Sequence, residues 1–151
     1  MKVIIFLISF VSIFGIKNGE LAAAGGDVKC EEIAQKKFLQ MLEKEKGKLV
    51  IVDYRTSDDY NKGHIPGAIL LSPKDKDFLQ QRLDYLALQW KRNGKTAVII
   101  DNDGKEAKIF CRNMKLTTKY EQIYSLKTGM RLWTGPMEKG EMPAPVKKGK
   151  K

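Results

Sequence analysis

Two short apolar runs constrain the fold of this chain more than any other feature. The first lies in KLVIVDYR, residues 48–55, and the second in KTAVIID, residues 95–101. Runs this short and this continuously apolar are typical of strands that are buried on both faces of a parallel sheet. Both are flanked by segments with helical patterns, so the chain is expected to fold as an α/β domain.

The rest of the sequence alternates between helix and strand patterns. Helices are expected over 30–47, 56–63, 75–94 and 105–116, and further strands within 64–72 and 120–129. Apolar spacing, acids in first turns and glycines after last turns support these assignments. The alternation indicates a three-layer fold, in which helices flank a central, mostly parallel sheet of about five short strands.

The N-terminus has the pattern of a secretory signal peptide. Lys2 precedes the uncharged run Val3–Ile16, and alanines occupy positions 22–24. This order predicts a signal peptide over residues 1–24, cleaved near Ala24, and a periplasmic or secreted protein. The run is shorter than the roughly 20 residues of a membrane span, so an uncleaved anchor is the less favoured alternative. A lipoprotein is less favoured still, because Cys30 follows Asp-Val-Lys.

The remaining chain divides into a domain over residues 28–136 and a Pro- and Lys-rich tail over 137–151, which is expected to be flexible. The formal net charge is +10; residues 1–24 contribute +1 and residues 146–151 contribute +4, which leaves +5 for residues 25–145. No basic stripe interleaved with aromatic residues occurs, so no nucleic-acid partner is expected. The tail suits at most a weak contact with a membrane surface.

The chain has two cysteines, Cys30 and Cys111. In an oxidising compartment they could form a disulfide, provided that their Cα atoms approach within about 7 Å. Two separately buried or reactive thiols are the alternative, which the sequence leaves open. With one histidine and no CxxC pair, a zinc site has no support, and no metal or other cofactor is expected.

One stretch of the chain resembles a known family. The segment IVDYRTSDDYNKGHIPGAILLS, residues 51–72, is similar to the first signature of the rhodanese-like domain family. The segment LKTGMRLW, residues 126–133, resembles its second signature, with Thr128 in place of the first of two glycines. The resemblance spans about residues 28–136 and implies the fold of that family, which includes sulfurtransferases.

The first signature also supplies the residues that shape the scaffold. Asp53 and Arg55 flank one position at a strand end, so both can point to the same side and fix the following loop. His64 is expected as a buried ring that bridges two loops; a catalytic base is the less favoured reading. The scaffold positions implied by the resemblance are Asp53, Arg55, Gly63, His64, Pro66 and Gly67.

Active members of the family place a nucleophilic cysteine at the start of the loop after the central strand. Its thiolate lies in a ring of backbone N–H groups at a helix N-terminus. Carried onto this chain, the resemblance places Asp101 at the cysteine position, and only the glycine of the loop pattern, Gly104, is retained. The former active-site loop comprises Asp101, Asn102, Asp103, Gly104, Lys105, Glu106 and Ala107.

The loop has lost both the nucleophile and the cationic character of that pattern. A carboxylate cannot form a persulfide, and three acids against Lys105 leave the loop at −2. We expect Asp101 to occupy the amide ring itself, as an internal anion or helix cap. A calcium loop does not fit: taking Asp103 as its fifth position places Ile99 first and Phe110 twelfth.

The sequence therefore indicates an exported rhodanese-like protein that is inactive as a sulfurtransferase and acts as a binding or regulatory module. Its expected partner is an exported protein or a sulfur-containing small molecule. The alternative is a divergent thiosulfate sulfurtransferase or sulfur carrier that uses Cys111 or Cys30. A phosphatase-like activity would also need the missing cysteine.

Overall fold

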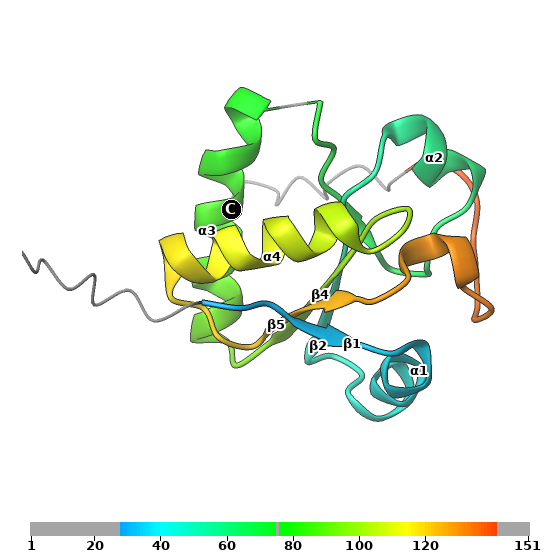
Figure 1. The fold of residues 1–151 in the computed structure, drawn as a ribbon, viewed down its shortest axis with the longest axis horizontal. Coiled ribbons are helices and arrows are strands. Elements are labelled where there is room, and N and C mark those ends of the chain that lie inside the picture. Colours follow the sequence, from blue (N-terminus) through cyan, green and yellow to red (C-terminus); the bar gives the residue numbers. More distant parts are fainter. Residues whose placement is uncertain (1–27, 75, 142–151) are drawn as a thin grey trace, which may run out of the picture.

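The computed structural model describes residues 28–74 and 76–141, and it forms an α/β domain (Figure 1). The elements follow in the order β1 (Glu31–Ile33), α1 (Gln35–Lys44), β2 (Leu49–Asp53), α2 (Ser57–Lys62), β3 (Ile69–Leu70), α3 (Lys76–Arg92), β4 (Thr96–Ile100), α4 (Lys105–Thr118), β5 (Ile123–Leu126) and the 3₁₀ helix η1 (Gly129–Leu132). The predicted signal peptide lies outside the described residues.

The five strands form one parallel sheet in the order β1-β5-β4-β2-β3. The two apolar runs, β2 and β4, pair with each other over five residues, from Leu49 opposite Thr96 to Asp53 opposite Ile100. Both β2 and β4 have a strand on each side, so the most apolar strands occupy interior positions of the sheet. The predicted mostly parallel sheet of about five strands is confirmed.

Side chains that alternate along β4 divide the core between the two faces of the sheet. Ala97 and Ile99 belong to a cluster built with α3 and α4, whereas Val98 and Ile100 belong to a cluster built with α1 and Tyr60 of α2. Figure 1 shows α4 and α1 on opposite sides of the sheet. The three-layer arrangement is therefore as predicted.

The first element differs from the prediction. A helix was expected from residue 30, but Glu31–Ile33 forms β1, and the helix begins at Gln35. β1 is an edge strand, and its three residues pair with Tyr124–Leu126 of β5. Only Ile33 of the three is buried, so β1 owes its extended form to pairing with β5, a tertiary contact that local periodicity does not record.

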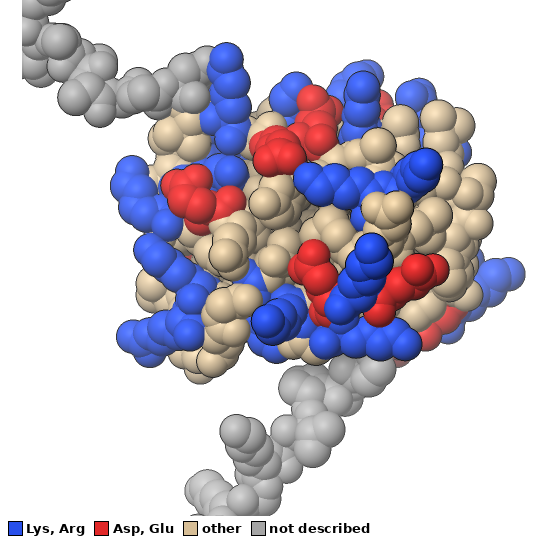
Figure 2. Space-filling view, turned by 90° about the horizontal axis from the view of Figure 1, so that it is seen from below, with Lys and Arg blue, Asp and Glu red and all other residues tan. Residues whose placement is uncertain are grey.

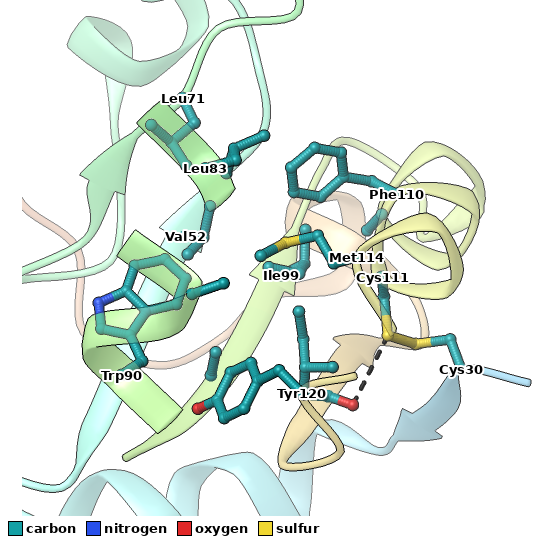
Figure 3. Close-up of a cluster of buried hydrophobic side chains, with 14 residues drawn as sticks. Cys30, Val52, Leu71, Leu83, Trp90, Ile99, Phe110, Cys111, Met114 and Tyr120 are labelled. Carbon is teal, nitrogen blue, oxygen red and sulfur yellow. Dashed lines mark hydrogen bonds between the residues drawn. A yellow bond between two sulfur atoms is a disulfide. The ribbon is translucent and has the colours of Figure 1, made fainter. Parts of the chain in front are cut away.

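A disulfide ties this edge strand to the opposite layer. Cys30, immediately before β1, is bonded to Cys111 of α4, with Cα atoms 5.6 Å apart and a sequence separation of 81. Figure 3 shows the bond beside Met114 and Phe110 in the α4 cluster. Both cysteines are buried. Of the two states that the sequence left open, the structure has the disulfide.

The C-terminal segment contacts the domain beyond its expected boundary at residue 136. Glu138 forms an antiparallel bridge with His64, and the backbone N–H of Gly140 donates to the carbonyl of Asn61 in α2 at 3.2 Å. The first residues of the predicted tail therefore pack on the domain. The remainder of that tail, from residue 142, lies outside the described residues.

Candidate functional site: the loop between β4 and α4

The loop that follows β4 is organised around the carboxylate of Asp101. The two carboxylate oxygens accept hydrogen bonds from the backbone N–H groups of Gly104, at 2.5 Å, and Ala107, at 3.1 Å. Asp101 is buried, and both donors belong to the start of α4, where N–H groups have no partner within the helix. The side chain of Asp101 thus occupies the anion position at this helix N-terminus.

The turn leading into η1 holds the same loop from the other side. The backbone N–H of Met130 donates to the carbonyl of Asp101 at 2.8 Å, and that of Arg131 donates to the carbonyl of Asn102 at 2.9 Å. These contacts join the loop to the segment that carries the second signature. The loop is therefore fixed by its own carboxylate and by the backbone of η1.

Two glycines permit this close approach. A Cβ atom on Gly129 would lie 2.5 Å from the carbonyl oxygen of Asp101, and one on Gly104 would overlap the carbonyl of Lys127. Both glycines also have positive φ, +54° and +93°, where other residues are strained. Thr128, in contrast, has φ −111°. Thr128 can therefore replace the first glycine of the second signature without an unusual backbone conformation.

A cavity of about 430 Å³ opens beside the loop. It lies at the carboxyl ends of β2 and β4, where ligand sites of parallel sheets occur. Three acids and two cations contribute to its wall. The lining residues are Tyr54, Arg55, Thr56, Pro73, Asp101, Asn102, Asp103, Lys105 and Glu106.

The two cations of the cavity are each held by an acid. The guanidinium of Arg55 makes a two-point contact with the buried carboxylate of Asp53, at 2.8 and 2.6 Å, and also donates to the carbonyl of Gly63 at 2.8 Å. The ammonium of Lys105 lies 3.1 Å from a carboxylate oxygen of Asp103. The backbone N–H and the side chain of Lys105 lower the pKa of Asp103.

Among the three acids of the wall, Asp101 is held by backbone N–H groups and Asp103 by Lys105, whereas Glu106 has neither kind of partner among the described residues. It is exposed, and it makes no ion pair with any residue of the described part of the chain. Burial raises the pKa of the neighbouring phenol of Tyr54, and the charge of Glu106 raises it further. The ring of Tyr54 stacks on Phe110 with centroids 4.3 Å apart, which fixes its orientation at the cavity wall.

The loop also contacts α2. Asn102 of the loop helps to lower the pKa of Asp59 in α2, and Thr56, the N-cap of α2, accepts from the backbone N–H of Asp59. The pKa of Asp59 is lowered, first by its hydrogen bond with Thr56. The predicted scaffold and the predicted loop are thus neighbours in the structure.

The remaining scaffold residues lie in the turn after α2, on the side of the C-terminal segment. The Nδ1–H of His64 donates to the carbonyl of Tyr60 at 2.9 Å, its Nε2 lies 3.0 Å from Oε1 of Glu138, and its ring stacks on that of Tyr60. The backbone N–H of Gly67 donates to the same Glu138 oxygen at 3.1 Å, and Pro66, before it, is exposed. His64 is buried and is not part of the cavity wall.

Neither cysteine belongs to the cavity wall, and both are consumed in the disulfide. The described part of the chain also contains no group of three or more His, Cys, Asp or Glu side chains placed to hold a metal ion. Within the same residues, no helix has the length and apolar character needed to cross a membrane.

The sequence prediction missed the cavity residues Tyr54, Thr56 and Pro73. Tyr54 is the first residue after β2, and Thr56 lies two residues further on. Ligands bind at the carboxyl ends of parallel strands, and this rule could have identified both residues. Pro73 belongs to the segment after β3, and no local pattern marks it.

Comparison with known proteins agrees with these features. The sequence model described as "Rhodanese-like domain" matches residues 34–136. A curated relative, the uncharacterized protein YibN of Escherichia coli, is 28% identical over 95 residues, which cover 61% of this chain and 62% of that protein. The chain thus spans less than two thirds of the length of the curated relative.

Two solved structures share the fold at low sequence identity. The rhodanese-like domain of the Anabaena sp. Alr3790 protein superposes with a TM-score of 0.57 at 22% identity, covering 77% of this chain and 86% of that domain. The thiosulfate sulfurtransferase of Pseudomonas aeruginosa gives a TM-score of 0.57 at 22% identity, covering 75% of this chain and 20% of that enzyme.

Proposed function

The chain belongs to the rhodanese-like domain family, and we propose that it is a member without sulfurtransferase activity that acts as a binding or regulatory module. The observation that carries this proposal is the position of the Asp101 carboxylate, which accepts hydrogen bonds from the N–H groups of Gly104 and Ala107. These are donors at a helix N-terminus, where an anionic nucleophile or a bound anion would otherwise be stabilised.

Sulfur transfer through a persulfide requires a thiolate. Asp101 cannot supply one, and the two cysteines of the sequence are bonded to each other. The disulfide counts against the alternative of a divergent sulfurtransferase that uses Cys111 or Cys30. Neither cysteine contributes to the cavity wall.

The charges around the cavity oppose an anionic sulfur donor. Arg55 is neutralised by Asp53 and Lys105 by Asp103, so the wall keeps the negative charge of Glu106 without a cation to balance it. A like-charge contact near 4 Å costs roughly 1–4 kcal/mol at the dielectric constants of a protein surface. Thiosulfate would therefore meet repulsion where an active enzyme provides attraction.

The cavity has the oriented ring of Tyr54 in its wall and more acids than cations around it. These features suit the binding of a partner that is not chemically changed. The proposed partner is an exported protein or a sulfur-containing small molecule, met in the periplasm or outside the cell, as the signal-peptide pattern of residues 1–24 suggests. No nucleic-acid partner is proposed, and any membrane contact would be weak and confined to the Lys-rich tail.

A sulfur-transfer assay from thiosulfate to cyanide tests the proposal on the full chain. The expected rate equals the background without protein, in both the oxidised and the reduced protein. The matched variants are Asp101→Ala, which frees the amide donors, and Lys36→Ala, an exposed position on α1. A rate well above background that Asp101→Ala abolishes and Lys36→Ala preserves would overturn the proposal.

A further inference from the structure

A second pocket lies between α4 and the residues that precede β1. Its volume is about 270 Å³, and it shares no lining residue with the cavity beside the loop after β4. Apolar and cationic side chains alternate around it. The lining residues are Val28, Lys29, Cys30, Lys108, Ile109 and Arg112.

The wall of this pocket contains one half of the disulfide. Cys30 lines the pocket, whereas Cys111, to which it is bonded, does not. Cys111 has no exposed surface (0%), and Cys30 keeps 6% of its surface exposed. Figure 3 shows Cys111 on the side of the bond that faces the core cluster and Cys30 on the far side. A reagent that enters the pocket therefore meets Cys30 first.

Three of the six lining residues are cations. Lys108 lies 2.7 Å from the carboxylate of Glu32. In contrast, the guanidinium of Arg112 donates to the neutral carbonyl of Val28 at 3.2 Å, and it pairs with no acid in the described part of the chain. Figure 2 shows Lys and Arg side chains spread over a whole face with acids between them, so positive charge alone does not distinguish the pocket. Cations beside a disulfide do distinguish it, because they attract and stabilise an attacking thiolate.

We propose that Cys30 is a site of thiol–disulfide exchange, and that the pocket admits a small thiol that carries carboxylates, such as glutathione. Its thiolate attacks Sγ of Cys30, a new S–S bond forms there, and the bond between Cys30 and Cys111 breaks. The electron pair of the broken bond goes to Sγ of Cys111, which takes up a proton from water. A second thiol of the same kind then attacks the mixed disulfide, so that two small thiols are oxidised and one protein disulfide is reduced.

The surroundings of the released Cys111 favour a mixed disulfide that lasts. Its sulfur remains in the apolar cluster that includes Phe110 and Met114. Thiols in apolar surroundings lose their proton less readily, and the protonated thiol is not a nucleophile. Cys111 therefore attacks the mixed disulfide slowly, and the adduct on Cys30 can be trapped.

Exchange also loosens the edge of the sheet. Only Ile33 of the three residues of β1 is buried, so without the cross-link β1 is held mainly by its pairing with β5. The redox state of the surrounding thiols thus controls how firmly β1 is attached. This exchange goes beyond the proposed function and does not depend on it, because it transfers no sulfane sulfur and does not use the cavity beside Asp101.

Peptide mapping of the full oxidised chain tests the site of attack. The protein is incubated briefly with glutathione and then alkylated. Glutathione should be found on Cys30 and the alkyl group on Cys111, in about tenfold or greater excess over the reverse arrangement. Equal labelling of the two cysteines, or glutathione mainly on Cys111, would overturn the proposal. So would the absence of an adduct under conditions in which the chain unfolded in urea reacts.

The role of the pocket is tested with thiols of different charge. Lys108→Gln combined with Arg112→Gln should slow adduct formation with glutathione several-fold and leave that with uncharged 2-mercaptoethanol unchanged. The matched control, Lys36→Gln at an exposed position on α1, should leave both rates unchanged. A variant that merely loosened the fold would react faster with both thiols. That result, unchanged rates with both thiols, or an equal slowing of both reactions, would contradict the assigned pocket.

Discussion

Oδ2 of Asp101 lies 3.1 Å from the backbone nitrogen of Ala107, so the loop after β4 is closed onto the first turn of α4 by its own side chain. The second oxygen binds the N–H of Gly104. An anion supplied by the protein itself has two consequences: it stabilises the helix start, and it leaves the amide donors unavailable to a ligand.

Asp101→Ala should lower the free energy of unfolding by about 1–3 kcal/mol, because it removes a buried acceptor from two N–H groups at a helix N-terminus. Asp101→Asn should lower the free energy of unfolding by a smaller amount, since the amide oxygen can still accept one of the two hydrogen bonds from Gly104 and Ala107. Urea denaturation measures both. Asp103→Ala is the control: its carboxylate bonds to Lys105 at an exposed position, so its loss should be smaller. Equal losses for the two alanine variants would contradict the role of Asp101.

The position of Asp101 could be predicted because strand β4 is apolar throughout and the loop starts where the apolar run ends. The Asp53–Arg55 contact could also be predicted, since alternate residues of a strand point to the same side. In contrast, β1 was missed because two of its three residues are exposed acids, which resemble the first turn of a helix. Pairing with β5, about 90 residues away, decides its conformation.

The contact between His64 and Glu138 could not be predicted from the sequence. The two residues are 74 positions apart, and one acid in a Pro- and Lys-rich segment carries no local pattern. The sequence left the Cys30–Cys111 pairing undecided for the same reason. Spacing along the chain does not determine whether two Cα atoms come close enough for a disulfide to form. Contacts between distant segments depend on packing that periodicity does not encode.

The disulfide should contribute measurably to stability. It closes a loop of 81 residues, and bonds of this kind contribute about 2–5 kcal/mol, mainly by restricting the unfolded chain. The double variant Cys30→Ala, Cys111→Ala should therefore unfold at a lower urea concentration than the oxidised protein. A reductant should lower the midpoint of the original protein and leave that of the double variant unchanged. A reductant effect on the double variant would contradict this explanation.

Gly129→Ala should destabilise the domain more than Gly47→Ala. Both glycines have positive φ, which costs an alanine about 1–2 kcal/mol, but a Cβ atom meets nothing within 4 Å at Gly47 and meets the Asp101 carbonyl at Gly129. The additional loss at Gly129 measures the close contact between η1 and the loop. Thermal unfolding of the two variants under the same conditions gives the comparison. Similar melting temperatures would show that the contact is unimportant.

Stability should fall at alkaline pH in part through Tyr120. Burial, followed by the influence of Tyr124, raises the pKa of this phenol above its usual 10.0, and its hydroxyl donates to the carbonyl of Lys95 at 2.6 Å. Because the folded-state pKa is raised, the contribution is fully present below pH 10 and is lost as the pH rises toward the folded-state pKa. Tyr120→Phe should lose about 0.5–1.5 kcal/mol at neutral pH and show a shallower alkaline decline. An unchanged slope between pH 10 and 11 would contradict this assignment.

The most direct test of the central claim is the intact mass of the protein after incubation with thiosulfate, measured without reductant. If Asp101 has replaced the sulfur-carrying residue and the two cysteines remain bonded, the mass should stay that of the unmodified, oxidised chain. A gain of one sulfur atom, located on Cys30 or Cys111 by peptide mapping, would contradict the account and identify the chain as a sulfur carrier.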